Sequence, residues 1–490
     1  MQPGSVPDRT APATARGSRI RGYLQILAVV SGARLFGLAS QFLVLVILSR
    51  ILSKDSFGDM MTAFSFYRLA SIALGVGPSL LLLFHISRSP HDREAEVRLH
   101  RYSAILGALI SGVVALAGVF AAGPIAAALG KPALAAWFVL LAPFAVFSTL
   151  LIVATGALEG RSRISESIVL GEAAPNAIRI VLLPIIAFAG LPDDYVAHAM
   201  TASVLAPWLW AARRIWSRKI AGTTPWSRWD YDYSAKYVVA TLFANQLAAV
   251  DILVAGTLFS SEIAAEYAVA SRIAALYSFF QLALLKRFAP RAATLLEGGN
   301  NAALRVEVEL CRRLTIGCAA FTICGIVLIA PYLLPVFGHY AGAEVLLIWL
   351  AIPTFIQSFY MTSDRLLTIG GQANVALAVT GLSFLTLVTM PVAGSAAIGP
   401  LAIPAAMIVS AILFQPFVAT KARKLFDIRT VGFADLAAML CGSLAIAGHA
   451  LVRSPLSAVA ACATLAALAL VYMVPAVMRV RTRADAPATS

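Results

Sequence analysis

Residues 133–155 read ALAAWFVLLAPFAVFSTLLIVAT. No charged residue interrupts this run, and it is long enough to cross a bilayer as an α-helix, which takes about 20 mostly apolar residues. Similar runs rich in Leu, Ala and Val recur along the whole chain. Because they are longer than barrel strands, and because a helix satisfies its own backbone hydrogen bonds in lipid, we expect an all-α membrane protein.

Composition agrees with this expectation. Hydrophobic residues make up 60% of the 490 residues and charged residues 13%, with a mean hydropathy of +0.84. Soluble domains have about 45–50% apolar and about 25% charged residues, so a soluble, disordered or fibrous protein is excluded. The pattern predicts fourteen transmembrane helices over residues 24–48, 60–86, 102–122, 133–155, 167–189, 196–214, 236–259, 264–286, 312–334, 344–367, 373–393, 400–420, 432–452 and 456–478.

The basic residues are distributed as the positive-inside rule requires. With the N-terminus in the cytoplasm, 30 of the 38 Lys and Arg residues fall on the cytoplasmic side and 4 on the opposite side. The split predicts an even number of spans with both termini in the cytoplasm. It also explains the net charge of +14 as topology, so we expect no nucleic-acid partner.

The chain repeats weakly at a shift of 207 residues. The segment Ser53–Asp59 corresponds to Ser260–Glu266, and Pro184 to Pro391. Corresponding halves around a central cavity are a recurring plan of transporters, so we expect two six-helix halves and two additional C-terminal helices. The predicted regions are a disordered tail (1–19), an N-terminal half (20–216), a cytoplasmic linker (217–235), a C-terminal half (236–424), the additional helices (425–480) and a cytoplasmic tail (481–490).

Motifs for catalysis or for bound metals are missing from the sequence. The five cysteines have no Cys-x-x-Cys spacing and no neighbouring His, and they read as small packing residues. The sequence holds no phosphate-binding loop, no nucleophile elbow and no zinc-protease helix. We therefore expect no cofactor, no metal and no enzymatic activity.

Four arginines lie inside predicted spans: Arg34, Arg68, Arg179 and Arg272. An ionised group at mid-bilayer costs at least about 2.5–3.5 kcal/mol, so such residues usually face a wet cavity or a partner. Helical spacing places Gln41 on the face of Arg34, and Glu172 and Asn176 on the face of Arg179. Snorkelling or an internal Glu172–Arg179 pair is the structural alternative.

The acidic candidates inside spans are Glu172, Asp251 and Asp364, and Asn245 could add an oxygen ligand near Asp251. A buried carboxylate can carry a proton or Na⁺. It can equally pair with an arginine in a span, and for Asp251 we favour pairing with Arg68 or Arg272. The arginines outnumber these acids, so a cavity lined by all of them suits an anionic solute, and guanidinium forks match phosphate oxygens.

Two stretches resemble a known family. The first runs through Arg34-Leu-Phe-Gly, Leu48-Ser-Arg-Ile-Leu-Ser-Lys-Asp-Ser-Phe-Gly58 and Leu74–Ser79, and the second from Asp251 to Arg272. They resemble Wzx-type polysaccharide flippases of the multidrug/oligosaccharidyl-lipid/polysaccharide exporter (MOP) superfamily. The resemblance implies transfer of an undecaprenyl-pyrophosphate-linked oligosaccharide across the bacterial inner membrane. It also implies substrate-binding roles for Arg34, Arg68 and Arg272, because the related lipid II flippases use cations on the same spans.

We therefore expect a flippase for exopolysaccharide, capsule or O-antigen (lipopolysaccharide) synthesis. Its partners would be the lipid-linked oligosaccharide, membrane lipid and the polymerase and other assembly proteins. Two alternatives stay open. One is a cation-coupled multidrug exporter of the same superfamily, and the other is a membrane glycosyltransferase or ligase of the polysaccharide pathway.

Overall fold

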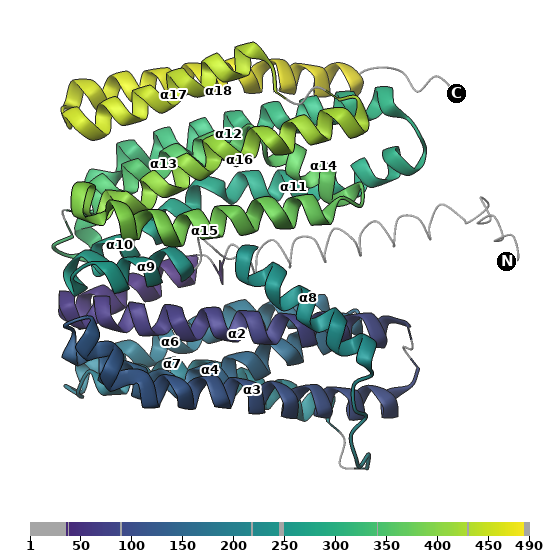
Figure 1. Ribbon diagram of the computed structural model, residues 1–490, viewed down its shortest axis with the longest axis vertical. Helices are drawn as coiled ribbons and strands as arrows, with labels where there is room; N and C mark the ends of the chain where they lie inside the picture. Colours follow the sequence, from purple (N-terminus) through teal and green to yellow (C-terminus); the bar gives the residue numbers. More distant parts are fainter. Residues whose placement is uncertain are drawn as a thin grey trace, which may run out of the picture. The chain divides into compact units, whose positions relative to one another are not determined.

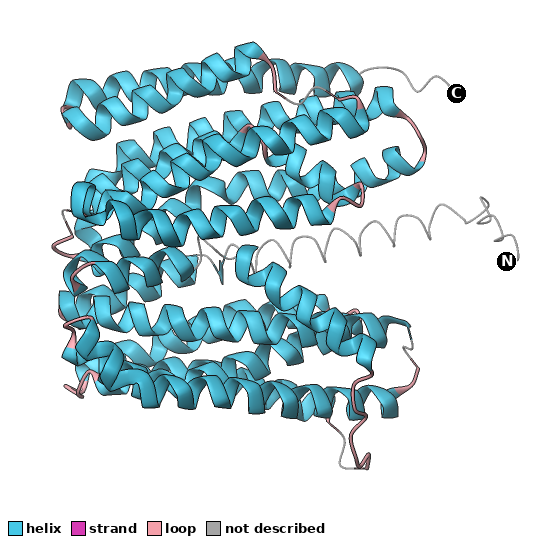
Figure 2. Ribbon diagram, viewed as in Figure 1, coloured by secondary structure: helices cyan, strands magenta, loops and turns pink. Residues whose placement is uncertain are grey.

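All regular structure in the described part of the chain is helical, with no strand (Figure 2). The computed structural model describes residues 36–37, 39–88, 91–216, 219–244, 249–340, 342–428 and 431–484. The prediction of an all-α membrane protein is confirmed. The tails 1–19 and 485–490 and most of the predicted span 24–48 lie outside the described residues.

Most helices follow one another through short turns, and a longer connection joins α7 to α8 (Figure 1). After a helix over Ala39–Ile51 come α2 (Lys54–Arg88), α3 (Arg93–Ala128), α4 (Pro132–Gly160), α5 (Ile164–Ile168), the π-helical turn η1 (Val169–Ala173), α6 (Ala174–Phe188), α7 (Asp194–Ile215), α8 (Arg228–Ala244), α9 (Asp251–Leu258), α10 (Ser261–Ala274), the 3₁₀ turn η3 (Ala275–Ser278), α11 (Phe279–Glu297), α12 (Asn301–Phe337), α13 (Ala343–Ser358), α14 (Met361–Ile369), α15 (Ala373–Ile398), the 3₁₀ turn η4 (Gly399–Leu401), α16 (Ala402–Phe426), α17 (Phe433–Val452) and α18 (Pro455–Ala484).

Within the described ranges, nine helical stretches are long and apolar enough to cross a membrane. The helices α13 and α14 are bent by 49° and form a tenth crossing if they count as one span. One of the nine stretches, Leu377–Phe426, holds α15 and α16, which pack against each other on either side of η4. The count of fourteen spans stays a prediction.

Contacts divide the chain into two compact units. Unit 1 comprises residues 1–44, 70–116 and 140–238, and unit 2 comprises residues 45–69, 117–139 and 239–490. The units cut through α2, α3 and α4, so their limits differ from those of the predicted halves, whose boundaries stay a prediction.

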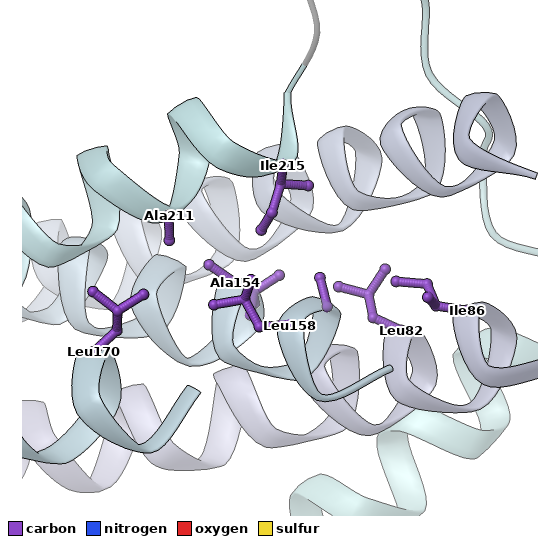
Figure 3. Close-up of a cluster of buried hydrophobic side chains, with 9 residues drawn as sticks. Leu82, Ile86, Ala154, Leu158, Leu170, Ala211 and Ile215 are labelled. Carbon is purple, nitrogen blue, oxygen red and sulfur yellow. The ribbon is translucent and has the colours of Figure 1, made fainter. Parts of the chain in front are cut away.

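Unit 1 has a core of aliphatic side chains from four helices. Leu82 and Ile86 of α2 meet Ala154 and Leu158 of α4 there, together with Leu170 of η1 and Ala211 and Ile215 of α7 (Figure 3). The side chains of this core are at most 7% exposed. Small residues on α4 and α7 let the helices approach closely, as is usual for helix packing in membranes.

In unit 2 the two additional helices pack on the C-terminal half. Helix α18 runs along α12, and α17 contacts α13 and α18 (Figure 1). A buried polar network connects α17 and α18 to α12. The Arg312 side chain meets Asp435 Oδ1 at 2.5 Å and Glu309 at 2.7 Å, and the Tyr472 hydroxyl donates to the same Asp435 oxygen at 2.7 Å. The network anchors these helices through charges rather than through apolar contact alone.

Candidate functional site

The first cluster of candidate residues surrounds Arg179 in unit 1. Arg179 is 6% exposed, and its Nε donates to Ser203 Oγ at 2.9 Å and its Nη1 to Asn176 Oδ1 at 3.3 Å. The ring of Phe144 lies 5.9 Å from its guanidinium carbon. Helix α6 presents Asn176 and Arg179 one turn apart, and α7 supplies Ser203. These two hydrogen bonds of the buried guanidinium thus go to neutral acceptors.

Glu172 belongs to the π-helical turn η1, just before α6. A π turn widens the helix by one residue and occurs often at functional sites. The Glu172 side chain is exposed and lies beside Gly37, where an added Cβ would lie 3.6 Å from the Glu172 Cβ. Asn176 Nδ2 donates to the Gly37 carbonyl at 3.3 Å, so the first span contacts the Arg179 cluster. Gln41, one turn further along that span, is half-buried.

The second cluster surrounds Asp251 in unit 2. Asp251 opens α9 and is fully buried, and Ser271 of α10 donates a hydrogen bond to its Oδ2. Its Oδ1 has no hydrogen-bond donor among the described residues. The hydroxyl of the fully buried Tyr267 lies nearby without hydrogen-bond geometry. Among the described residues, the hydrogen bond to the Asp251 carboxylate that has good geometry is therefore the one from Ser271.

Arg272 is the charged neighbour of Asp251. Its guanidinium acts on the carboxylate electrostatically, although the two described side chains form no ion pair within 4 Å. Arg68 of α2 is half-buried. Its guanidinium carbon lies 6.0 Å from the centroid of the ring of Phe64, which precedes Arg68 by one helical turn. The pairing of Asp251 with either arginine, and the substrate-binding role of these arginines, stay predictions.

The remaining candidates are placed as follows. Asp364 lies half-buried in the first turn of α14, with Arg365 as its charged neighbour. Arg34 and Asn245 lie outside the described residues. Among the described residues no group of three or more His, Cys, Asp or Glu side chains could hold a metal ion.

The segment Leu48–Gly58, on which the family resemblance depends, is packed against the second half of the chain. Ser49 donates to the Phe337 carbonyl at 3.0 Å, and Arg50 donates to the carbonyls of Pro335 and Val336 at 2.8 and 2.9 Å. These carbonyls belong to the last turn of α12, where a helix leaves its acceptors without intrahelical partners and where the helix dipole favours a cation. The motif therefore caps a distant helix.

The end of the same segment meets α10. Lys54 forms a 2.7 Å ion pair with Glu266, and Phe57 is fully buried with its ring 6.0 Å from that of Tyr340. A Cβ at Gly58 would lie 1.8 Å from the Ser261 carbonyl oxygen, so only glycine allows this approach. The sequence repeat aligned Ser53–Asp59 with Ser260–Glu266, and the structure brings these two segments into contact.

The family is decided by a comparison with known proteins. A family model described as "Polysaccharide biosynthesis protein" matches residues 25–287, more than half of the chain. The chain belongs to this family. A comparison with curated proteins finds no match.

Solved structures show the fold. An inward-facing multidrug resistance MATE family transporter of the MOP superfamily is 18% identical with a TM-score of 0.69, covering 81% of this chain and 96% of that one. The lipid II flippase MurJ in an inward closed conformation is 12% identical with a TM-score of 0.69, covering 91% and 99%. A MOP superfamily transporter from Pyrococcus furiosus, described with a binding pocket of reverse polarity, is 16% identical with a TM-score of 0.60, covering 81% and 95%.

This member of the polysaccharide biosynthesis family therefore has the fold of MOP superfamily transporters. The resemblance seen in the sequence is confirmed by the family match and by the fold. Sequence reasoning missed Arg312 and Asp435. Asp435 lies within the predicted span 432–452, and this position alone was a signal for a buried charged pair.

Proposed function

We propose that this protein moves an undecaprenyl-pyrophosphate-linked oligosaccharide across the bacterial inner membrane by alternating access, with both termini in the cytoplasm. The observation that carries the proposal is the family match over residues 25–287, which ties the chain to polysaccharide biosynthesis. The transported unit would serve exopolysaccharide, capsule or O-antigen synthesis, in concert with a polymerase and other assembly proteins.

The arginines within the spans supply the chemistry that this cargo needs. A pyrophosphate must leave water on its way through the bilayer, and guanidinium forks replace its hydration with charge-assisted hydrogen bonds. Arg272 and Arg68 are half-buried, so part of each side chain can reach a ligand. Arg179 is held more tightly by Ser203 and Asn176, so we assign it the smaller share of the binding.

The decisive experiment replaces Arg272 in the full-length protein, in a strain whose polymer export depends on it. Arg272→Ala should abolish export and accumulate lipid-linked repeat units, while the purified protein stays monodisperse. Arg272→Lys should recover export only in part, because an ammonium is a point charge and not a fork. The matched control is Arg305→Ala, since Arg305 is a half-exposed arginine paired with the exposed Asp427. Normal export by Arg272→Ala would refute the assigned role.

A second candidate function is cation-coupled export of an amphipathic solute. The observation in its favour is the buried Asp251, whose Oδ1 has no hydrogen-bond donor among the described residues and whose carboxylate is a group suited to a proton or Na⁺. Dye efflux driven by an imposed ion gradient in vesicles, without any lipid-linked sugar, would support this function over the flippase. Asp251 could couple either transport, and Glu172 and Asp364 remain candidates for the same role.

A further inference from the structure

An apolar groove lies on the surface of unit 1, and none of the candidate residues for cargo or ion binding lines it. It has a volume of about 440 Å³ and is formed by side chains of η1, α6 and α7, chiefly Val169, Leu170, Ile178, Ala206, Pro207 and Trp210. Its polar lining comes from Ser165 and Glu166 of α5, at one end. The groove is therefore hydrocarbon-like along its length and polar at one mouth.

Local backbone geometry creates the groove. The π turn η1 widens the helix between α5 and α6, and Pro207 removes a backbone hydrogen-bond donor inside α7. Leu170 forms the back wall, because its side chain packs into the core beside Ala211 and Ile215 (Figure 3). The groove rests on this rigid core, so its shape does not depend on a mobile loop.

The length of the groove corresponds to one leaflet of a bilayer. From Ser165 to Ile178 the chain advances thirteen residues, which is about 20 Å at 1.5 Å per helical residue. One leaflet contributes about 15 Å of hydrocarbon, and the interfacial layer adds a few ångströms. The stretch Ile164–Phe188 is among the helices apolar enough to span a membrane. The helical wall of the groove is therefore about as long as the hydrocarbon layer of one leaflet.

Positive charge adjoins the groove at Trp210, one of its lining residues. Arg214 lies over the ring of Trp210 with its guanidinium carbon 4.7 Å from the ring centroid, and both Arg213 and Arg214 are exposed. Glu166 is engaged by Arg163, so it does not offset these two arginines. Tryptophan and arginine at a helix end are typical of the headgroup layer, where arginine meets lipid phosphates.

We propose that the groove binds one acyl chain of an anionic phospholipid, whose phosphate lies against Arg213 and Arg214. A phospholipid is favoured over the polyprenyl carrier because it constitutes the leaflet itself, so mass action fills the site with it. The groove also extends through one leaflet only, as an acyl chain does. The site is independent of the cargo, and its existence does not rest on the proposed flippase function.

The test uses Trp210 as a native reporter in the full-length protein. Vesicles of phosphatidylcholine receive increasing fractions of brominated phosphatidylglycerol or of brominated phosphatidylcholine. The Trp210 signal is the difference between the unaltered protein and Trp210→Phe. Phosphatidylglycerol should quench it at a roughly 25-fold lower fraction than phosphatidylcholine, because each of the two arginines near the headgroup contributes about fivefold.

Two matched pairs of variants separate the effect of the arginine charge on lipid binding from the effect of the apolar groove. Arg214→Gln should reduce the preference for phosphatidylglycerol by about fivefold, whereas Arg228→Gln, at an exposed arginine outside the groove, should leave it unchanged. Ala206→Phe fills the groove from an exposed position and should weaken quenching by both lipids. Ala187→Phe, at an exposed alanine of α6 outside the groove, should not.

Three results would overturn the proposal. One is equal quenching by the two brominated lipids in the unaltered protein. Another is unchanged quenching in Ala206→Phe. The third is relief of phosphatidylglycerol quenching by polyprenyl phosphate at a fraction well below that of the phospholipid, which would make the carrier lipid the occupant.

Discussion

Asp251 and Asp435 are both buried aspartates of unit 2, with exposures of 0% and 7%, yet their surroundings differ. Asp435 accepts from the Gly432 amide and the Tyr472 hydroxyl, each at 2.7 Å, and meets Arg312 at 2.5 Å. Asp251 accepts one side-chain hydrogen bond, from Ser271, and its Oδ1 has no donor among the described residues.

This difference separates a structural carboxylate from a candidate functional one. A buried charge that is paired and fully hydrogen-bonded holds helices in place, and removing its partner is costly. An unsatisfied buried polar group in a folded protein calls for a reason, such as a ligand that comes and goes. We therefore assign Asp435 to holding α17 and α18 on α12, and propose Asp251 for ion coupling.

The largest expected effect on stability comes from removing the partner of Asp435. Arg312→Met keeps an unbranched, flexible side chain, although a shorter one, and leaves Asp435 buried without its counter-charge. It should lower the free energy of unfolding by about 3–5 kcal/mol, measured by denaturant unfolding in detergent micelles. Arg313→Met is the matched control, because Arg313 is more exposed and pairs only with Glu309 among its described contacts. It should cost less than about 1 kcal/mol.

A double variant tests the explanation. Replacing Asp435 by leucine in the Arg312→Met background removes the uncompensated charge, so most of the lost stability should return. If the double variant is as unstable as Arg312→Met alone, packing of the arginine stem rather than charge accounts for the loss.

Neutralising Asp251 should have a smaller effect on stability than removing the partner of Asp435. Asp251→Asn keeps the shape, and Ser271 can still donate to the amide oxygen, so the cost should stay below about 1 kcal/mol. Gradient-driven transport should nevertheless fall at least tenfold, while binding of the lipid-linked sugar persists. A loss of stability similar to that of Arg312→Met, restored by neutralising Arg272, would instead favour the predicted ion pair.

The smallest expected effect on stability comes from Asp230, an aspartate outside the predicted spans. Burial alone would raise the pKa of Asp230, but hydrogen bonds from His85 and Ser227 outweigh it and hold this pKa below its usual value. A depressed pKa in the folded state means that Asp230 stabilises the protein above the unfolded pKa of about 3.9, and that this contribution is lost as the pH falls through the folded value.

Thermal unfolding between pH 7 and pH 3 checks this expectation. Asp230→Asn should lower the melting temperature slightly at pH 7, and the difference from the unaltered protein should shrink as the pH falls below about 4. A difference that is constant across this range would show that the carboxylate charge plays no part.

Much of the fold could be predicted from local sequence. Long apolar runs such as 133–155 specify helices because lipid offers no other partner for the backbone, and the structure has helices at the predicted ranges that it describes. The arrangement of the candidate sites was harder to predict from the sequence. Arg179 was expected near Glu172 from helical spacing, but Ser203, which binds it, comes from the neighbouring helix α7.

The segment Leu48–Gly58 could be recognised in the sequence, but its contacts could not be predicted from it. Its residues carried the family resemblance, but nothing in them reveals that Arg50 caps α12 or that Lys54 pairs with Glu266, 212 residues further along. The role of Gly58 was equally hidden, since it depends on the approach of the Ser261 carbonyl.

The sequence by itself determined that this protein is helical, crosses a membrane and belongs with polysaccharide biosynthesis proteins. Hydropathy and charge are properties of short segments, so they can be read without a structure. Only the tertiary structure decided which buried charges are satisfied. The partners of Asp251 and Asp435 lie on other helices, and helix packing rather than sequence spacing sets the distances between them.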